Sequence, residues 1–321
     1  MPPSTARTGP QLLLLLTENH TMVAPRDLRA LVRMAAEAED AGFDGVMASE
    51  HIALGPDADA HGRMRNPRDM AMAYNQDPAT PWPSSIVLLS AVAAVTTRLR
   101  LVAGAVIAPL RHPLLLAKQF ATLDLLSDGR LVVIPVVSWN RQEYEALGLP
   151  WSERGARLDE HLAAWRALWR DTPASFEGRH YRFKDVYLEP RPERYDGPTL
   201  WIGGGQVHPR LVRRLVTYGH GFAPLHGVRR EDLARIAAAM TEAGRDISEL
   251  ELVGGTPARF PADDRVADLD QALAAIPRQL ERGVGTIVIK PSQFIDDPRE
   301  FGRWCRDVIA RVAQLGATAT S

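Results

Sequence analysis

Residues 99–138 read LRLVAGAVIAPLRHPLLLAKQFATLDLLSDGRLVVIPVVS, and this stretch indicates the fold. Two short apolar runs, 99–107 and 131–138, flank an amphipathic segment at 113–126 that begins with proline and ends at the turn SDG, 127–129. Proline in the first turn and a glycine-containing turn behind the last one are typical helix boundaries. Strands that are apolar throughout are typical of parallel sheets covered on both faces. The stretch therefore predicts a strand–helix–strand unit.

The same alternation continues along the whole chain. The other strand candidates are the apolar runs at 11–16, 44–49, 199–203, 219–225, 250–256 and 285–290. The other helix candidates lie near 25–41, 84–97, 152–170, 208–217, 229–243, 267–282 and 298–314. Eight strand–helix pairs predict an α/β fold, a closed (β/α)8 TIM barrel, which needs about 250 residues. Chemistry in such barrels lies at the C-terminal ends of the strands, here called the mouth.

Two long insertions interrupt the alternation. The expected divisions are a loose leader at 1–10, a single barrel domain at 11–315 and a C-terminal tail at 316–321. Within the domain, 52–83 and 171–198 exceed the usual connection length of about 12–15 residues. The first follows strand two, so we predict that it walls a pocket at the mouth. The second precedes strand five, so we expect it toward the opposite end; it contains a predicted hairpin with Gly178 at its turn.

The composition excludes several classes of protein. A formal net charge of −1 provides no general attraction for nucleic acid or for an anionic membrane. No apolar run approaches the ~20 residues of a membrane span, and QLLLLLT at 11–17 is too short for a secretory signal. The single Cys305 excludes an intramolecular disulfide and a cysteine metal site, and we expect a buried structural thiol. We therefore expect a cytoplasmic protein without a metal.

Polar residues follow the predicted strands at the mouth. Glu50 and His51 come directly after strand two. A histidine there is a plausible acid/base group, because its unperturbed pKa of about 6.5 lets it exchange protons near neutrality; the alternative is a surface histidine without a role. His20, which follows strand one, is a second candidate. His112 precedes a proline, so we expect it to orient the start of a helix.

Strands four and five end in groups suited to a flat heterocycle with a phosphate. The candidates are Ser138, Trp139 and Asn140 after strand four, and Gly203, Gly204, Gly205 and Gln206 after strand five. An indole and an amide could wall and bond a ring, although Trp139 could equally pack in the core. Glycines before a helix let backbone amides approach a phosphate, but a plain tight turn explains them equally well.

Four ordered segments resemble the luciferase-like monooxygenase superfamily, most closely its branch that uses the deazaflavin coenzyme F420. They are RHPLLLAKQFATLDLLSDGRL (111–131), SWNRQEYEALGLPWSERGARLDEHLAAWRALW (138–169), FEGRHYRF (176–183) and LWIGGG (200–205). The resemblance covers about 11–315. It implies a barrel of the bacterial luciferase-like type whose mouth binds a reduced flavin or deazaflavin, and a homodimer paired through barrel helices.

The resemblance also implies roles for particular residues. Glu50 and His51 match an acidic–histidine pair beside the ring. Ala105 and Val106 match a pair joined by a non-prolyl cis peptide, a bulge that backs the ring. The loop with Trp139 and Asn140 matches one whose backbone amides meet the ribityl-phosphate side of the cofactor. Gly204 and Gly205 match glycines that bind the phosphate.

Two departures from the family pattern stand out. Strand four reads Ile134-Pro135-Val136-Val137-Ser138 where the family is rich in glycine, which bears on how closely the tail of the cofactor can approach. The stretch 219–222 reads GHGF where the family often has an acidic residue, and we expect His220 to alter the charge of the mouth.

Three functions remain open. The first is hydride transfer between F420 and a small organic substrate, with His51 as acid/base, Glu50 holding the ring or tuning the histidine, and a substrate pocket of His20, Tyr74 and Trp82. The second is a two-component monooxygenase that uses reduced FMN from a separate reductase, with Trp82 and Trp139 excluding water. The third is a non-catalytic flavin-binding barrel. Arg63, Arg65 and Arg68 in the first insertion could meet an acidic substrate or form a solvated loop face.

Overall fold

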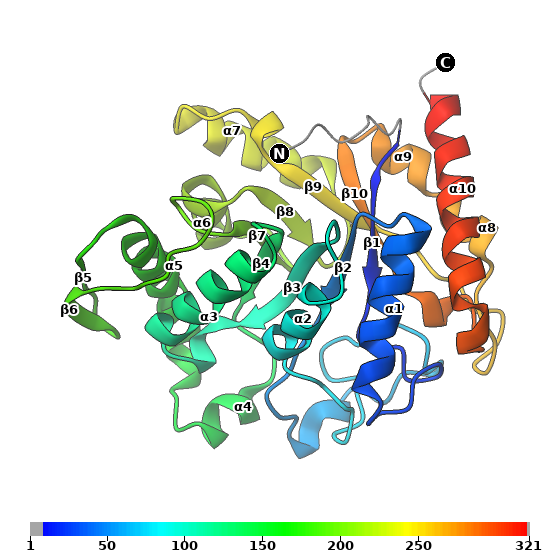
Figure 1. Cartoon of the computed structure of the whole chain (residues 1–321), viewed down its shortest axis with the longest axis horizontal. Coiled ribbons are helices and arrows are strands. Elements are labelled where there is room, and N and C mark those ends of the chain that lie inside the picture. Colours follow the sequence, from blue (N-terminus) through cyan, green and yellow to red (C-terminus); the bar gives the residue numbers. More distant parts are fainter. Residues whose placement is uncertain (1–8, 320–321) are drawn as a thin grey trace.

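The computed structural model describes residues 9–319, with side chains through 315; most of the expected leader and the end of the expected tail lie outside the described residues. Eight parallel strands form a closed barrel in the order β1-β10-β9-β8-β7-β4-β3-β2 (Figure 1). They are β1 Gln11–Leu15, β2 Gly45–Ala48, β3 Arg100–Ile107, β4 Leu131–Val136, β7 Thr199–Gly204, β8 Gly221–Pro224, β9 Glu251–Gly255 and β10 Val284–Ile289. The predicted TIM barrel is confirmed.

Helices surround the barrel. They are α1 Leu28–Ala41, α2 Ser85–Ala93, α3 Pro113–Leu126, α4 Arg141–Ala146, α5 Arg154–Arg170, α6 Pro209–Tyr218, α7 Arg230–Glu242, α8 Leu269–Leu273, α9 Ile276–Leu280 and α10 Phe301–Ala319. The single helix expected at 267–282 is wrong: α8 and α9 are separate, because Pro277 lacks an amide and starts a new helix. The last helix continues to Ala319, past the expected domain end at 315. No described helix is long and apolar enough to span a membrane.

Side chains from all eight strands fill the inside of the barrel. Leu13, Val102, Val132, Ile134, Trp201 and Val253 are buried there. Five further apolar side chains pack against them but remain partly exposed, in the last three positions of their strands: Met47, Ala105, Val136, Ala223 and Val288. We call these five the floor. Their exposure shows that the mouth is open to solvent, while the layers beneath it are closed.

The opposite end, here called the bottom, is closed by a polar group. Arg100 on β3 forms two hydrogen bonds with Glu251 on β9, at 2.7 and 2.8 Å. Its guanidinium also donates to Gln11 and lies over the ring of Trp201, 4.8 Å from the centroid. Thr286 donates to the same Glu251. Residues from five strands therefore meet across the bottom of the barrel.

His220 lies at the bottom, at the start of β8. Its Nδ1 accepts a hydrogen bond from the Leu200 amide at 3.1 Å. Asp44 has the same position just before β2, and its carboxylate accepts the Leu12 amide at 2.7 Å. Burial lowers the pKa of His220, which keeps Nδ1 available as an acceptor near neutral pH. The expectation that His220 alters the charge of the mouth is therefore wrong, because the residue joins two strands at the other end.

The second insertion forms the predicted hairpin, β5 Ala174–Glu177 and β6 Arg182–Val186. Gly178 begins its turn, donating to the Tyr181 carbonyl at 2.9 Å. The Tyr181 ring packs edge-on against His161 of α5 and His112 at the start of α3. The start of α3 follows the C-terminal end of β3 and therefore lies at the mouth, so the contact of Tyr181 with His112 makes the expected location at the opposite end wrong for the turn. The His112 ring caps α3 by accepting the Leu114 amide, as expected.

The first insertion, 52–83, lies below the barrel in Figure 1, on the side to which the strand arrows point. Asn66 donates to the carbonyls of Ala262 and Arg265, at 3.1 and 2.7 Å. The Lys290 ammonium donates to the Asp69 carbonyl at 2.6 Å. These bonds come from segments after β9 and β10, so they fix the insertion as a wall of the mouth.

The arginines of this wall are largely engaged. Arg68 bonds both oxygens of Asp296, at 2.8 and 2.7 Å, and is nearly buried. Arg63 pairs with Asp59 and Asp77. Arg65 is exposed. Two of the three guanidiniums thus already meet carboxylates of this chain.

The buried face of α10 contains Cys305, which is not exposed. Burial raises the pKa of its thiol, which disfavours the reactive thiolate. The expected buried structural thiol is confirmed.

Candidate active site

His51 lies in a cluster of aromatic rings at the mouth. Its ring centroid is 5.2 Å from that of Trp82 and 5.2 Å from that of Trp139, both edge-on. Tyr74 packs on Trp139 at 4.9 Å, and its hydroxyl donates to the Trp139 carbonyl at 3.2 Å. We call these four residues the aromatic cluster. The structure therefore brings together the predicted acid/base group, one predicted cofactor contact and two predicted pocket residues.

Glu143 is the carboxylate that contacts His51, and the sequence reasoning missed it. Its Oε1 lies 3.2 Å from Nδ1 of His51 and accepts the Ile52 amide at 2.7 Å. Its Oε2 accepts the Ser138 hydroxyl at 2.9 Å. The sequence contained one signal for this role. Glu143 lies in the first turn of α4, the helix that follows the end of β4, and this position faces the mouth.

Glu50 bonds residues other than His51. Its carboxylate is buried and pairs with Arg111, at 2.6 and 3.1 Å, and it accepts the Ser85 hydroxyl at 2.8 Å. Neighbouring side chains at the end of a strand project to opposite sides, so Glu50 faces α2 and α3 while His51 faces the mouth. We correct the expectation: Glu50 fixes Arg111, and the histidine partner is Glu143.

The expected bulge on β3 is present one residue earlier than predicted. The non-prolyl cis peptide joins Gly104 and Ala105, not Ala105 and Val106, and the register between β3 and β4 shifts between Gly104 and Val106. A side chain at Gly104 would approach the Ile134 Cδ1 to 2.8 Å, which explains the glycine. Ala105 belongs to the floor, whereas Val106 packs outward among the helices. Val106 is therefore wrong as a cofactor contact.

The residues after β4 mainly form hydrogen bonds with other residues of the protein. Asn140 is buried: its side chain caps α4 through the Gln142 amide and donates to the Ala53 carbonyl at 2.9 Å. Its own amide donates to the Ser138 hydroxyl at 3.1 Å. The expected contact of the Asn140 amide with a cofactor would require this bond to Ser138 to be exchanged, and it stays a prediction. Ser138 is likewise engaged by Glu143, and Trp139 alone faces the cluster.

The glycines after β7 divide into two kinds. A side chain at Gly203 would come within 1.9 Å of the Ala223 carbonyl oxygen, so close packing of β7 on β8 requires this glycine. Gly204 and Gly205 leave more room, with the nearest side-chain atoms at 3.4 and 3.6 Å. Gln206 is exposed, and α6 begins only after His208, which caps it through the Leu211 amide. Only Gly204, Gly205 and Gln206 leave space for a ligand.

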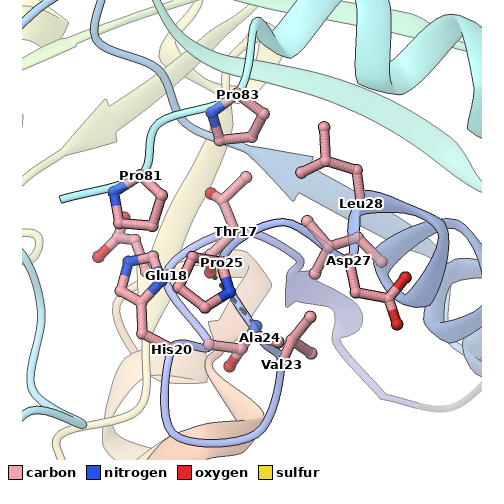
Figure 2. Close-up of a pocket in the computed structure, with 12 residues that line it drawn as sticks. Thr17, Glu18, His20, Val23, Ala24, Pro25, Asp27, Leu28, Pro81 and Pro83 are labelled. Carbon is pink, nitrogen blue, oxygen red and sulfur yellow. Dashed lines mark hydrogen bonds between the residues drawn. The ribbon is translucent and has the colours of Figure 1, made fainter.

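His20 belongs to a separate group after β1. It lines a small hollow, partly open to solvent, between the β1–α1 loop and the segment containing Pro81 and Pro83 (Figure 2). Its Nε2 is enclosed without a hydrogen-bond partner in the described part of the chain, and burial together with nearby Lys290 lowers the pKa of His20 to about 4. The lining does not include Trp82, so the expected single substrate pocket consists of two parts.

Lys290 and Glu18 complete this group. Both are buried, and the ammonium lies 3.8 Å from the carboxylate. Burial lowers the pKa of Lys290, while Glu18 and Asp69 oppose that change. Glu18 also accepts the Ala71 amide at 3.0 Å, which ties the end of β1 to the first insertion. The sequence analysis predicted neither residue. Lys290 directly follows β10, and Glu18 lies in the loop after β1.

Comparison with known proteins finds relatives that use FMNH2 and relatives that use F420. A dimethylsulfone monooxygenase that depends on FMNH2, from Pseudomonas putida, is 36% identical over 123 residues, which are 37% of this chain and about a third (34%) of that protein. An F420-dependent glucose-6-phosphate dehydrogenase from Beutenbergia cavernae is 30% identical over 290 residues, 87% of this chain and 75% of that protein.

The crystal structure of monooxygenase RslO1 from Streptomyces bottropensis shares the fold, with a TM-score of 0.72, 22% identity and coverage of 94% of this chain and 98% of that one. Residues 11–293 match the family described as luciferase-like monooxygenase, which is most of the barrel. The chain therefore belongs to the luciferase-like monooxygenase family.

Proposed function

We propose that this chain is an oxidoreductase that binds coenzyme F420 at the mouth and transfers hydride between it and a small organic substrate. The observation that carries the proposal is an open apolar floor beside His51, whose Nδ1 is bonded to Glu143. Flat apolar surfaces with few polar groups suit planar heterocycles. The F420-dependent relative covers most of the chain, which favours the deazaflavin over a flavin.

The described residues fit such a cofactor. The floor contains no charged side chain, and Gly204 and Gly205 leave room at the end of β7. Ile134 and Val136 project into the barrel from β4, where the family is rich in glycine. We therefore infer that the tail of the cofactor passes along β7 rather than β4, and that its phosphate meets the backbone at Gly204 and Gly205.

The side chains around the floor have distinct roles in this proposal. When bound, the cofactor supplies the carbon that gives or takes the hydride. His51 would hold or move the substrate proton at Nε2, a contribution of about 10²–10⁴ in rate for a positioned acid/base group. Trp82, Trp139 and Tyr74 would orient the ligand and exclude water.

A two-component monooxygenase that uses reduced FMN from a separate reductase is the second candidate. It is favoured by the FMNH2-dependent relative and by the aromatic cluster, since exclusion of water protects reactive oxygen chemistry. Titration of the purified protein with F420 and with reduced FMN under nitrogen distinguishes the two. We expect F420 to bind at least tenfold more tightly. Tighter binding of FMN would select the second candidate, and failure of both would support a non-catalytic barrel.

The substrate is proposed to be small and uncharged. Arg63 and Arg68 already pair with carboxylates, and Lys290 lies beside Glu18. An acidic substrate at Lys290 would have to displace Glu18, which would leave a buried carboxylate without a counter-ion. The hollow beside His20 is lined by apolar residues together with the carboxylates of Glu18 and Asp27, which would repel an acidic substrate. Competition of neutral and acidic alcohols with a bound reporter would test this preference.

We also propose that the chain forms a homodimer, in the cytoplasm. Large apolar side chains are exposed on the neighbouring helices α2 and α3: Val87 is 71% exposed, Leu115 63% and Leu126 60%. Exposed apolar side chains gathered on one face typically mark a protein interface. Light scattering is expected to give twice the chain mass of 35.4 kDa, and Leu115→Glu is expected to reduce it to the chain mass.

A further inference from the structure

Glu143 joins the ends of β2 and β4 through buried hydrogen bonds. Its carboxylate is only 1% exposed and accepts the Ile52 amide at 2.7 Å and the Ser138 hydroxyl at 2.9 Å. A weaker third contact comes from the Ala53 amide at 3.4 Å. These donors fix both carboxylate oxygens. The Nδ1 of His51, 3.2 Å from Oε1, therefore faces a fixed acceptor.

A fixed acceptor selects one form of a neutral imidazole. Nδ1 must carry the proton to donate to Oε1, which leaves a lone pair on Nε2. None of the described residues forms a hydrogen bond with Nε2 of His51. This atom is not one of the buried polar atoms without a partner, so it is accessible from the mouth. Trp82 and Trp139 hold the ring from two sides. The ring can therefore neither turn freely nor find another partner for Nδ1.

We propose that Glu143 is a positioning residue that keeps His51 in the tautomer protonated on Nδ1, so that Nε2 presents its lone pair to the mouth. In the reaction, Nε2 takes the proton of a substrate O–H while the oxygen keeps the bonding electron pair, and the reverse step returns it. The carboxylate stabilises the imidazolium that forms. This role rests on the proposed function, but the tautomer is a property of the free protein.

Glu145 provides a matched control on the same short helix. Its side chain is 55% exposed and pairs with Arg141 at 2.7 Å. Removing it changes one carboxylate of α4 without touching His51. Glu143→Gln is the conservative variant, because its amide oxygen can still accept from Ile52 and from Nδ1. Glu143→Ala removes the acceptor entirely.

The experiment is nitrogen NMR on protein labelled at histidine, without cofactor, at a pH where the His51 ring is neutral. The chain has nine histidines, and the His51 signals are those missing from the His51→Asn spectrum. We expect wild type, Glu143→Gln and Glu145→Ala to show a protonated Nδ1 and an unprotonated Nε2. Glu143→Ala is expected to show averaged signals from two exchanging tautomers.

A neutral wild-type ring protonated on Nε2 would overturn the proposal, as would a Glu143→Ala spectrum identical to wild type. If circular dichroism shows that Glu143→Ala does not fold, the wild-type and Glu143→Gln spectra decide, and loss of the Nδ1–H form in Glu143→Gln contradicts the proposal. Titration with F420 is run separately on each protein. Absence of F420 binding to wild type would refute the proposed function and leave the tautomer result standing.

Discussion

At the bottom of the barrel Arg100 and Glu251 neutralise each other, whereas at the mouth one ring nitrogen of His51 has no partner among the residues that the structure describes. The bottom group joins β3 to β9 and shares its carboxylate with Thr286. The mouth carries an exposed apolar floor. This difference leads us to expect that the bottom serves stability and that the mouth serves binding and chemistry.

Replacing His51 tests the functional end and has the largest expected effect. His51→Ala removes the acid/base group, so turnover should fall at least tenfold and up to about 10⁴-fold. F420 affinity should stay within a few-fold, because the floor and the glycines remain. Steady-state kinetics and fluorescence titration measure the two quantities. Unchanged turnover would remove His51 from this role.

Replacing Arg100 tests the structural end. Arg100→Met leaves the partly buried Glu251 without its counter-ion, so the free energy of unfolding should fall by about 2 kcal/mol, between the values for exposed and fully buried pairs. F420 affinity should not change, because the bottom lies at the other end of the strands. Urea unfolding and the titration above check both statements. A large loss of affinity with little loss of stability would contradict the comparison.

Acid should destabilise the fold through histidines that are buried in the neutral form. Burial lowers the pKa of His161 to about 4, and His20 is lowered similarly. The unfolded chain therefore binds more protons between pH 6.5 and 4, and stability is lost as pH falls through that window, by at most about 1.4 kcal/mol per pH unit for each histidine. Unfolding curves at pH 7, 6 and 5 measure this. In His161→Asn the free energy of unfolding should decrease less steeply as the pH falls. An equally steep decrease would assign the acid sensitivity to other groups.

The smallest effect is expected from Tyr74→Phe. The change removes the hydroxyl that donates to the Trp139 carbonyl and keeps the ring packing. Stability should fall by about 0.5–1.5 kcal/mol, as for a single hydrogen bond. Because Trp139 then loses a restraint, the KM for substrate should rise more than kcat falls. A drop in kcat alone would indicate that Tyr74 takes part in the reaction.

Local signals predicted the barrel well. The helix Pro113–Leu126 has the expected bounds, because proline and the turn at 127–129 mark both ends. The apolar strands were found to within a few residues. The failures over the partners of the site residues come from contacts between distant residues. Glu143 meets His51 across 92 positions of sequence, and nothing in the spacing shows that pair. Glu50 was expected beside His51 because it is adjacent in sequence, yet it bonds Arg111.

The central claim is that a planar redox cofactor lies on the floor within reach of His51. The crystal structure of the protein soaked with F420 tests it most directly. We expect the deazaflavin ring against Ala105 and Val288, the phosphate near Gly204 and Gly205, and Nε2 of His51 directed to the space beside the ring. A cofactor bound elsewhere, or an imidazole that faces away from it, would contradict the account.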